Sequence, residues 1–239
     1  MDVHVITAAN RSLYLDEIAA MHRHRHEIFV KYYGWTALES PDGLEIDEFD
    51  TPHTVYFVIL DKDGQLRGCD RVIPSWRPHM LTHLFPEYAD RPVPIGPAIW
   101  EWSRHAPGHP DWGDQINRQA RLASSIALLE FAASRGIEAY TGILEARALP
   151  MAARVGWRPE PLGAPVRYGE GESVACLCPA DLSLLPRLRR LAGVSEPLLI
   201  EIPAQAKARR AVELALKIGP PQAADAEAAI DAVLQRAQS

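Results

Sequence analysis

Three groups of charged and aromatic side chains do not follow the hydrophobic periodicity of the chain, and their residue types could do chemistry. They are Arg25 with Phe29 and Trp35, the acidic run 45–50, and the segment WEWSR at 100–104. Charged side chains are costly to bury unless they are paired, so a strand that carries Glu, Arg and two Trp residues is expected to line a site. Taken singly, each group also has an ordinary explanation, such as an arginine that reaches over the core or a solvated acidic loop.

Side-chain alternation along a strand gives the third group a direction. Glu101 and Ser103 are predicted to face one side of the sheet, while Trp102 and Arg104 face the other. Arg71, near the end of the strand-like run CDRVIP, adds a further cation.

The histidines and cysteines are predicted to have no chemical role. His22, His24 and His26 alternate on the first predicted helix, but no third ligand or glutamate motif accompanies them. We therefore interpret them as surface histidines and expect no metal site. The three cysteines show no metal-ligand spacing and are too few for a disulfide framework, so we expect reduced core thiols. These are Cys69, Cys176 and Cys178.

The composition of the 239 residues is that of a folded globular protein, with 47% hydrophobic and 23% charged residues. A net charge of −6 argues against a nucleic-acid-binding protein, which usually carries a basic face. No segment approaches the ~18 consecutive apolar residues of a membrane span, and the N-terminus lacks the pattern of a secretory signal. We therefore expect a cytoplasmic protein without a membrane span.

Hydrophobic periodicity predicts a mixed β-sheet with helices packed on it, because the order of elements is not a strict βαβα repeat. A tight turn at Asp63-Gly64 joins two strands, and Gly136 ends the longest helix. The segments 34–54 and 74–98 are predicted to be long loops. The predicted strands cover 2–6, 54–61, 65–74, 98–106, 137–144 and 172–178, and the predicted helices cover 14–32, 115–135 and 148–157.

Residues 1–185 are predicted to form one domain, followed by a helical C-terminal extension at 186–239. Beyond about residue 180 the chain becomes rich in Ala, Leu and Arg, and Gly-Pro-Pro at 219–221 separates two helical segments. A segment of this size is expected to pack on the domain or on a partner. The role of the extension is left open, and the sequence is compatible with a monomer or a homodimer.

The order and spacing of the candidate residues closely resemble those of the acyl-homoserine-lactone synthases, the LuxI-type autoinducer synthases. The resemblance covers about residues 1–185. One difference is Arg71-Val-Ile-Pro-Ser, where the family more often has Arg-Leu-x-Pro-Thr. The pattern consists of Arg25-x3-Phe29-x5-Trp35, Glu45-x-Asp47-x2-Asp50, Gly68-Cys69-x-Arg71, Pro78-x-Met80-Leu81-x3-Phe85-Pro86, Trp100-Glu101-x-Ser103-Arg104 and ALPMAARVGWRPEPLG.

This resemblance implies an α/β (α+β) fold similar to that of GNAT acyltransferases, in which a mixed β-sheet flanked by helices opens into a V-shaped acyl-pantetheine cleft. It implies an acyltransferase of quorum sensing. The amine of S-adenosylmethionine attacks an acyl thioester, and the carboxylate of the methionine part then displaces methylthioadenosine to close the lactone ring. No tightly bound cofactor is implied, only these two substrates.

The resemblance also implies a site for S-adenosylmethionine made of acids, arginines and aromatic side chains, which suit a cation that carries a carboxylate and an adenine. Glu101 is the expected general base for the amine, acting directly or through water, and a structural ion pair with an arginine is the alternative. The S-adenosylmethionine set is Arg25, Phe29, Trp35, Asp47, Asp50, Phe85 and Arg104. The catalytic set is Glu101, Arg104, Asp47 and Arg71.

The acyl donor is expected to be an acyl-CoA or an acyl carrier protein, which both present a phosphopantetheine thioester. Cations at the start of the longest helix could meet its phosphates, and Arg154 and Arg158 could extend the patch. The motif PDG-x-EIDEFD resembles that of the branch of the family that uses CoA thioesters of branched or aromatic acids. Ser103 and Thr141 are candidates for discrimination between acyl chains. The acyl-donor set is Ser103, Arg118, Arg121, Thr141 and Trp157.

Two other functions are compatible with these residues. One is a GNAT-like N-acyltransferase that acylates another amine and forms no lactone, so the release of methylthioadenosine would distinguish it. The other is a non-catalytic acyl-CoA-binding sensor. The complete acceptor set argues against a sensor, which has no need of it.

Overall fold

A mixed β-sheet organises the computed structural model, which describes residues 1–168 and 171–202. Within these residues nine strands follow the order β6-β8-β5-β4-β3-β2-β1-β9, with β7 paired to β8. The pairs β4–β5 and β1–β9 are parallel and the others are antiparallel. The strands are β1 (Asp2–Ile6), β2 (Val55–Leu60), β3 (Leu66–Pro74), β4 (Ile99–Pro107), β5 (Ala139–Glu145), β6 (Glu160–Pro161), β7 (Val166–Tyr168), β8 (Gly171–Pro179) and β9 (Leu199–Ile200).

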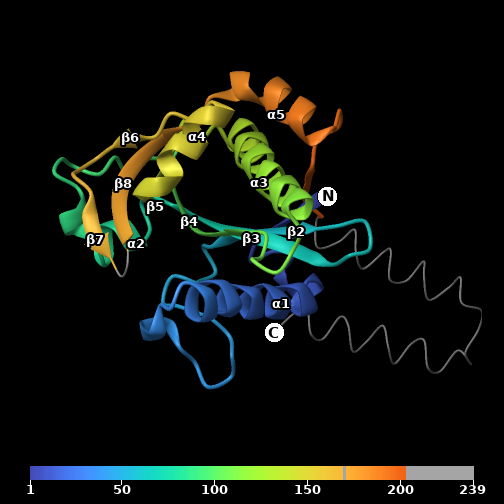
Figure 1. Ribbon diagram of the computed structural model, residues 1–239. Coiled ribbons are helices and arrows are strands. Elements are labelled where there is room, and N and C mark those ends of the chain that lie inside the picture. Colours follow the sequence, from blue (N-terminus) through green and yellow to red (C-terminus); the bar gives the residue numbers. More distant parts are fainter. Residues whose placement is uncertain (169–170, 203–239) are drawn as a thin grey trace, which may run out of the picture.

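Helices cover both faces of the sheet, as the sequence predicted. Figure 1 shows α3, α4 and α5 on one face and α1 on the other. Phe131 of α3 packs edge-on against Phe57 of the sheet, with 5.1 Å between ring centroids. On the opposite face, Met21 of α1 belongs to a second buried cluster with Tyr56. The helices are α1 (Leu15–Arg25), α2 (Met80–His83), α3 (Asp114–Arg135), α4 (Leu149–Val155) and α5 (Leu185–Ala192).

The longest helix and the first helix end as their sequences require. α3 ends at Gly136, which adopts the left-handed conformation with φ +66°. α1 continues into a π-helical segment, His26–Tyr32, so the predicted helix over 14–32 is confirmed. Such wide turns are often found at functional sites. After this segment the chain turns back, and the amide of Trp35 donates to the carbonyl of Phe29 at 2.9 Å.

A β-bulge in β4 reverses the predicted direction of Arg104. Arg71 pairs with Ser103 and Cys69 pairs with Ala106, so β4 carries one residue more than β3 over this interval. Among the described residues, Arg104 is the only non-glycine residue with positive φ, at +51°. The extra residue places Arg104 on the same face as Ser103, so the prediction that it faces the other way was wrong.

The parallel strands β4 and β5 pair over only three residues and then separate. Their register runs from Ile99 opposite Ala139 to Glu101 opposite Thr141. Directly after this point Gly142 approaches β4 so closely that an added Cβ would lie 2.6 Å from the carbonyl oxygen of Trp102. The strands therefore open into a V in the middle of the sheet, as the resemblance implied.

The C-terminal part of the described chain packs on the domain. Two segments predicted to belong to the extension, α5 and β9, contact α3 and β1. Glu130 of α3 joins them, because its carboxylate accepts the amides of Leu198 and Leu199 at 2.9 and 3.0 Å and a bond from Arg189 at 2.7 Å. The packed unit thus continues past the predicted break at 185/186. The helical prediction for 203–239 lies outside the described residues.

We expect Glu130→Ala to lower the free energy of unfolding by about 3 kcal/mol, because it leaves the buried amide of Leu198, the partly buried amide of Leu199 and Arg189 without their acceptor. Urea unfolding followed by circular dichroism measures this change. Glu138→Ala, an exposed position just beyond the same helix, is the control and should change stability by less than about 0.5 kcal/mol. Equal effects of the two variants would mean that Glu130 does not hold the C-terminal segment.

Candidate active site

A cleft of about 880 Å³ opens where β4 and β5 separate. One end is lined by side chains from the π-helical segment, α2 and the middle of β4. The other end is lined by the loop after β4, the first turns of α3, and α4. Of the predicted site residues, those that line the cleft are Phe29, Trp35, Phe85, Glu101, Ser103, Arg104, Arg118, Arg121 and Trp157.

Arg25 lies beneath the cleft, fully buried, and holds the acidic loop against the sheet. Its Nη1 and Nη2 donate to the two carboxylate oxygens of Asp50, each at 2.9 Å, and its Nε donates to Glu45. Fork-like pairing of this kind is the strong form of an arginine–carboxylate contact. Since Arg25 and Asp50 are not among the cleft-lining residues, both position the loop rather than face the ligand space.

Arg71 and Arg104 continue this pairing from the acidic loop toward the cleft. Arg71 is fully buried and donates to Asp47 at 2.5 Å, to Asp50 at 3.2 Å and to the hydroxyl of Ser103 at 3.0 Å. Arg104 contacts Glu45 at 3.0 Å and Asp47 at 2.6 Å. Arg104 lines the cleft, whereas Asp47 does not line it and keeps 14% of its side chain exposed, so Arg104 is the member of the network that reaches the cleft.

The charges of this network set one another's protonation. Burial would raise the pKa of the Glu45 carboxyl, but Arg25 and Arg104 lower it below its ordinary value. Burial would likewise lower the pKa of Arg25, yet Asp50 and Glu45 raise it. Glu45 and Arg25 are therefore charged at neutral pH and pair as ions within the network.

Glu101 is a buried carboxylate outside this network. It is 1% exposed, lines the cleft, and accepts the backbone amides of Met80 at 3.0 Å and Leu81 at 3.4 Å. Burial raises its pKa, although His79 and Arg71 act in the opposite direction. Among the described residues, no salt bridge joins Glu101 to Arg25, Arg71 or Arg104, the partners of the structural alternative. A carboxylate with a raised pKa in a cleft suits proton transfer.

Aromatic rings form one wall at the same end of the cleft. Phe29 and Trp35 stack with 5.1 Å between centroids, because the turn after the π-helical segment brings them together. Tyr168 meets Trp35 and Phe85 edge-on, at 5.6 and 6.1 Å. The guanidinium of Arg104 lies 5.6 Å from the centre of the Phe29 ring. This wall can hold a flat or cationic ligand.

The opposite end of the cleft is basic and apolar. Arg118 and Arg121 lie on the first turns of α3 and Arg154 on α4, whereas Arg158 does not line the cleft. Trp102 and Trp157 stack across the apolar part at 6.3 Å. Thr141 is fully buried and is not among the cleft-lining residues, which removes the geometric basis for its predicted contact with an acyl chain.

The histidines of the first helix are buried, so the prediction of surface histidines was wrong. His22 Nδ1 bonds the carbonyl of Glu45 at 2.8 Å, and His24 Nε2 bonds that of Ala106 at 2.9 Å. Burial lowers the pKa of both rings. They attach α1 to the acidic loop and to β4, contacts that a local sequence pattern does not reveal. Within the described residues no His, Cys, Asp or Glu group is arranged to hold a metal ion.

The three cysteines, for which no chemical role was predicted, are also part of the core. Cys69, Cys176 and Cys178 are buried free thiols, as predicted, and burial raises the pKa of each.

None of the described helices is long and apolar enough to cross a membrane.

Sequence reasoning missed the roles of Glu45 and Met80. Glu45 was part of the matched pattern, but only the fold shows that it joins Arg25 to Arg104. The sulfur of Met80 lies 3.3 Å from Arg71 Nη2 and 3.0 Å from Arg104 Nη1, and its amide binds Glu101. The predicted loop 74–98 therefore contains a short helix, α2, whose first turn positions the candidate base.

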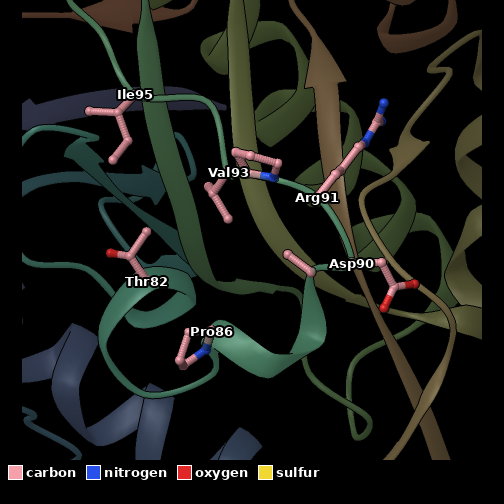
Figure 2. A pocket seen from close by; sticks show the side chains of 8 residues that line it. Thr82, Pro86, Asp90, Arg91, Val93 and Ile95 are labelled. Atoms are coloured by element: carbon pink, nitrogen blue, oxygen red, sulfur yellow. The ribbon is translucent and has the colours of Figure 1, made fainter.

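A second hollow, of about 410 Å³, lies beside α2 (Figure 2). Its charged side chains, Asp90 and Arg91, point away from it in Figure 2. Asp90 binds the amide of Ala164 at 3.0 Å and Arg91 the carbonyl of Pro161 at 3.0 Å, so both hold the neighbouring chain. This hollow offers no convergent polar groups and is not a candidate for catalysis.

The cleft, with its ion network and a buried glutamate of raised pKa, is that of an acyltransferase of the GNAT-like fold seen in acyl-homoserine lactone synthases. Residues 10–187 match the family model for autoinducer synthases, and the chain belongs to this family. It is similar to an isovaleryl-homoserine lactone synthase of Bradyrhizobium diazoefficiens, with 36% identity over 68% of this chain and 73% of the relative. An acyl-homoserine-lactone synthase of Ralstonia nicotianae is 34% identical over 69% of this chain and 83% of that protein.

Comparison with solved structures supports the same family. The CoA-dependent acyl-homoserine lactone synthase BjaI, solved with SAM and isopentyl-CoA, superposes with a TM-score of 0.76 and 30% identity, covering 86% of this chain and 98% of BjaI. The synthase LasI gives a TM-score of 0.66 at 26% identity, over 75% of this chain and 89% of LasI. The predictions of the family and of the fold are confirmed.

We expect Glu45→Gln to lower the free energy of unfolding at pH 7 by about 3 to 5 kcal/mol, because it leaves Arg25 and Arg104 buried without a shared partner. The folded-state pKa of Glu45 is lowered, so its contribution exists above its unfolded pKa and disappears as pH falls through the folded value. The difference between wild type and variant, measured by urea unfolding, should therefore shrink in acid. Glu48→Gln, exposed in the same loop, is the control, and a variant Glu45→Gln as stable as Glu48→Gln would contradict the role of the network.

Proposed function

We propose that this protein transfers a compact acyl group from acyl-CoA to the amine of S-adenosylmethionine and closes the product to an N-acyl-homoserine lactone, with release of methylthioadenosine. The observation that carries the proposal is the meeting of two half-sites at β4. The ion network and aromatic wall flank one end of a single cleft, and the basic patch and apolar tryptophans flank the other. Glu101 lies where they meet.

The acceptor half suits S-adenosylmethionine by charge. Asp47, paired to Arg104 behind the cleft lining, supplies negative charge near the cationic side, while Arg104 is the cation available to the carboxylate. Phe29 and Trp35 supply the stacked surface on which a sulfonium or an adenine can rest. Arg25 and Asp50 act through the loop, since neither lines the cleft.

Glu101 is the group that removes the proton from the acceptor amine, directly or through a water molecule. The freed amine attacks the thioester carbon, the N–C bond forms and the C–S bond breaks, and the thiol of CoA leaves with a proton. The carboxylate of the methionine part then attacks the carbon next to its sulfonium. The new C–O bond closes the lactone and the C–S bond to methylthioadenosine breaks. Arg104 is placed to orient that carboxylate.

CoA and a compact acyl group are favoured as donor for two reasons. The relatives named above include an isovaleryl-homoserine lactone synthase and a CoA-dependent synthase solved with isopentyl-CoA. In addition, the stacked pair Trp102 and Trp157 limits the width of the apolar part of the cleft. Arg118 and Arg121 would meet the phosphates at the start of α3.

Mass spectrometry of the products from S-adenosylmethionine and a panel of thioesters tests the proposal. We expect an N-acyl-homoserine lactone and one methylthioadenosine per lactone, with isovaleryl-CoA a better donor than a long-chain acyl-CoA. Acylation without methylthioadenosine release would identify an N-acyltransferase of another type, and binding without turnover a sensor. Turnover only with acyl carrier protein would overturn the choice of donor.

Glu101→Gln is expected to lower kcat about 10²-fold or more with little change in the affinity for S-adenosylmethionine. A general base acts in its deprotonated form, and its raised pKa moves the loss of activity in acid to higher pH than an ordinary glutamate would give. The acidic limb of the kcat–pH profile should therefore disappear in the variant. Near-wild-type turnover would show that Glu101 is not the base.

Asp47→Asn is expected to raise KM for S-adenosylmethionine about 30-fold or more and to leave KM for the acyl thioester within about threefold, because it removes the anion that is paired to Arg104 beside the acceptor half. Trp35→Ala should have the same but milder effect through loss of the stacked surface. Steady-state kinetics with each substrate varied in turn measures both constants. A defect confined to the acyl-donor KM would mean that the loop serves the other substrate.

A further inference from the structure

Asp70 is a buried carboxylate that the proposed chemistry does not use. It lies on β3, and its side chain has no exposed surface. One oxygen, Oδ1, accepts the indole N–H of Trp102 at 2.8 Å and bonds Nδ1 of His105 at 2.6 Å. The other oxygen, Oδ2, is buried and has no hydrogen-bond partner among residues 1–168 and 171–202. A carboxylate is costly to bury with so few donors, so Asp70 acts chiefly on these two side chains.

Both of these side chains belong to the wall of the cleft. His105 and Trp102 line it, and 41% of the His105 side chain is exposed. The two rings meet edge-on with 4.8 Å between centroids, and the hydroxyl of Ser124 on α3 lies 3.4 Å from Nδ1. His105 is therefore held at Nδ1 by Asp70 and Ser124, and its ring is held by Trp102.

The hydrogen bond to Asp70 determines which nitrogen can meet a ligand. A carboxylate only accepts, so Nδ1 carries a proton and is turned toward the buried side. In the part of the chain that the structure describes, no hydrogen bond engages Nε2. The Nε2 edge is thus the part of the ring that is available in the cleft, in an orientation that Asp70 sets.

The place of His105 along β4 indicates what it would meet. Residues 101–110 line the cleft without interruption, from Glu101, where the two proposed half-sites meet, to the loop that precedes the basic turns of α3. A donor that holds its thioester near Glu101 and its phosphates near Arg118 must pass its pantetheine arm along this stretch. His105 lies within it.

We propose that His105 is a positioning residue that hydrogen-bonds an amide of the pantetheine arm through Nε2, and that Asp70 orients it for this contact. Each pantetheine amide offers both an N–H and a C=O, so Nε2 finds a partner in either of its protonation states. The inference rests on the proposed function, because it assumes that an acyl-phosphopantetheine occupies the cleft. It adds a recognition element that is shared by CoA and carrier-protein donors.

Four variants separate a role at Nε2 from a role at Nδ1. His105→Phe keeps a ring against Trp102 but loses both nitrogens, and His105→Gln keeps a polar group near the position of Nε2. His105→Asn keeps a donor near the position of Nδ1, where Asp70 binds, and His53→Phe in an exposed loop is the matched control. KM and kcat are measured with isovaleryl-CoA and with the same acyl group on acyl carrier protein.

We expect His105→Phe and His105→Asn to raise KM for both donors about 3- to 10-fold, the range for one lost hydrogen bond. KM for S-adenosylmethionine should stay within about twofold. His105→Gln and His53→Phe should stay near wild type. A donor KM near wild type in His105→Asn but raised in His105→Gln would mean that His105 only supports Asp70, which would overturn the proposal. An unchanged donor KM in His105→Phe would overturn it as well.

Calorimetric binding gives a readout that does not depend on turnover. The affinity of CoA should fall in His105→Phe, while that of adenosine 3′,5′-bisphosphate, which lacks the arm, should be unchanged. Loss of both affinities would place the defect at the phosphate end and overturn the contact with the arm. Failure of the proposed function would be distinct, because wild type itself would then form no lactone with either donor.

Discussion

The proposed acceptor half of the molecule depends on one constraint. Three buried arginines and three carboxylates must pair with one another. Ions at this depth require partners, and here the three arginines come from three different elements. Arg25 comes from α1 and Arg71 from β3, while Arg104 comes from the bulge of β4. The carboxylates all come from the acidic loop, as Glu45, Asp47 and Asp50.

This pairing explains how a loop with little regular structure keeps a defined course. Residues 34–54 contain one short 3₁₀ turn, and the loop supplies few apolar groups to the core. Asp47 and Asp50 also bind backbone amides within the loop, so the residues that hold the arginines shape the chain as well. Such buried ion sets add little net stability compared with an apolar core, but they fix geometry. The proposed acceptor site is therefore positioned mainly by charge, whereas the proposed donor site is positioned by the packing of α3 and α4 on the sheet.

The two halves meet because of two irregularities in the centre of the sheet. The separation of β5 from β4 after Glu101 creates space for a ligand, and the bulge at Arg104 places a cation at the edge of that space. Without the bulge, alternation would turn Arg104 into the apolar layer under α3. The positive φ of Arg104 is then a local strain that the ion pairs to Glu45 and Asp47 offset.

Much of the fold could be predicted from the sequence, because it is encoded locally. The apolar spacing of α3, with Gly136 at its end, and the Asp63-Gly64 turn are examples. The motif spacing likewise indicated residues that the structure brings together, such as Arg25 and Asp50. What could not be predicted depends on contacts distant in sequence. The bulge has no glycine to mark it, and β9 pairs with β1 from the far end of the described chain. His22 binds a loop carbonyl 23 positions away.

Amide hydrogen exchange in Arg25→Lys tests most directly whether charge positions the acceptor loop. A lysine keeps the charge but cannot bind Glu45 and Asp50 together. In the wild type, the amides of Glu45, Asp47 and Phe49 are hydrogen-bonded, two of them to the carboxylates of the loop. We expect exchange over residues 44–51 to accelerate at least tenfold in the variant, while amides of β5 and β8 keep their protection. Unchanged exchange over 44–51 would show that the loop is held by other contacts and would contradict the central role of the ion network.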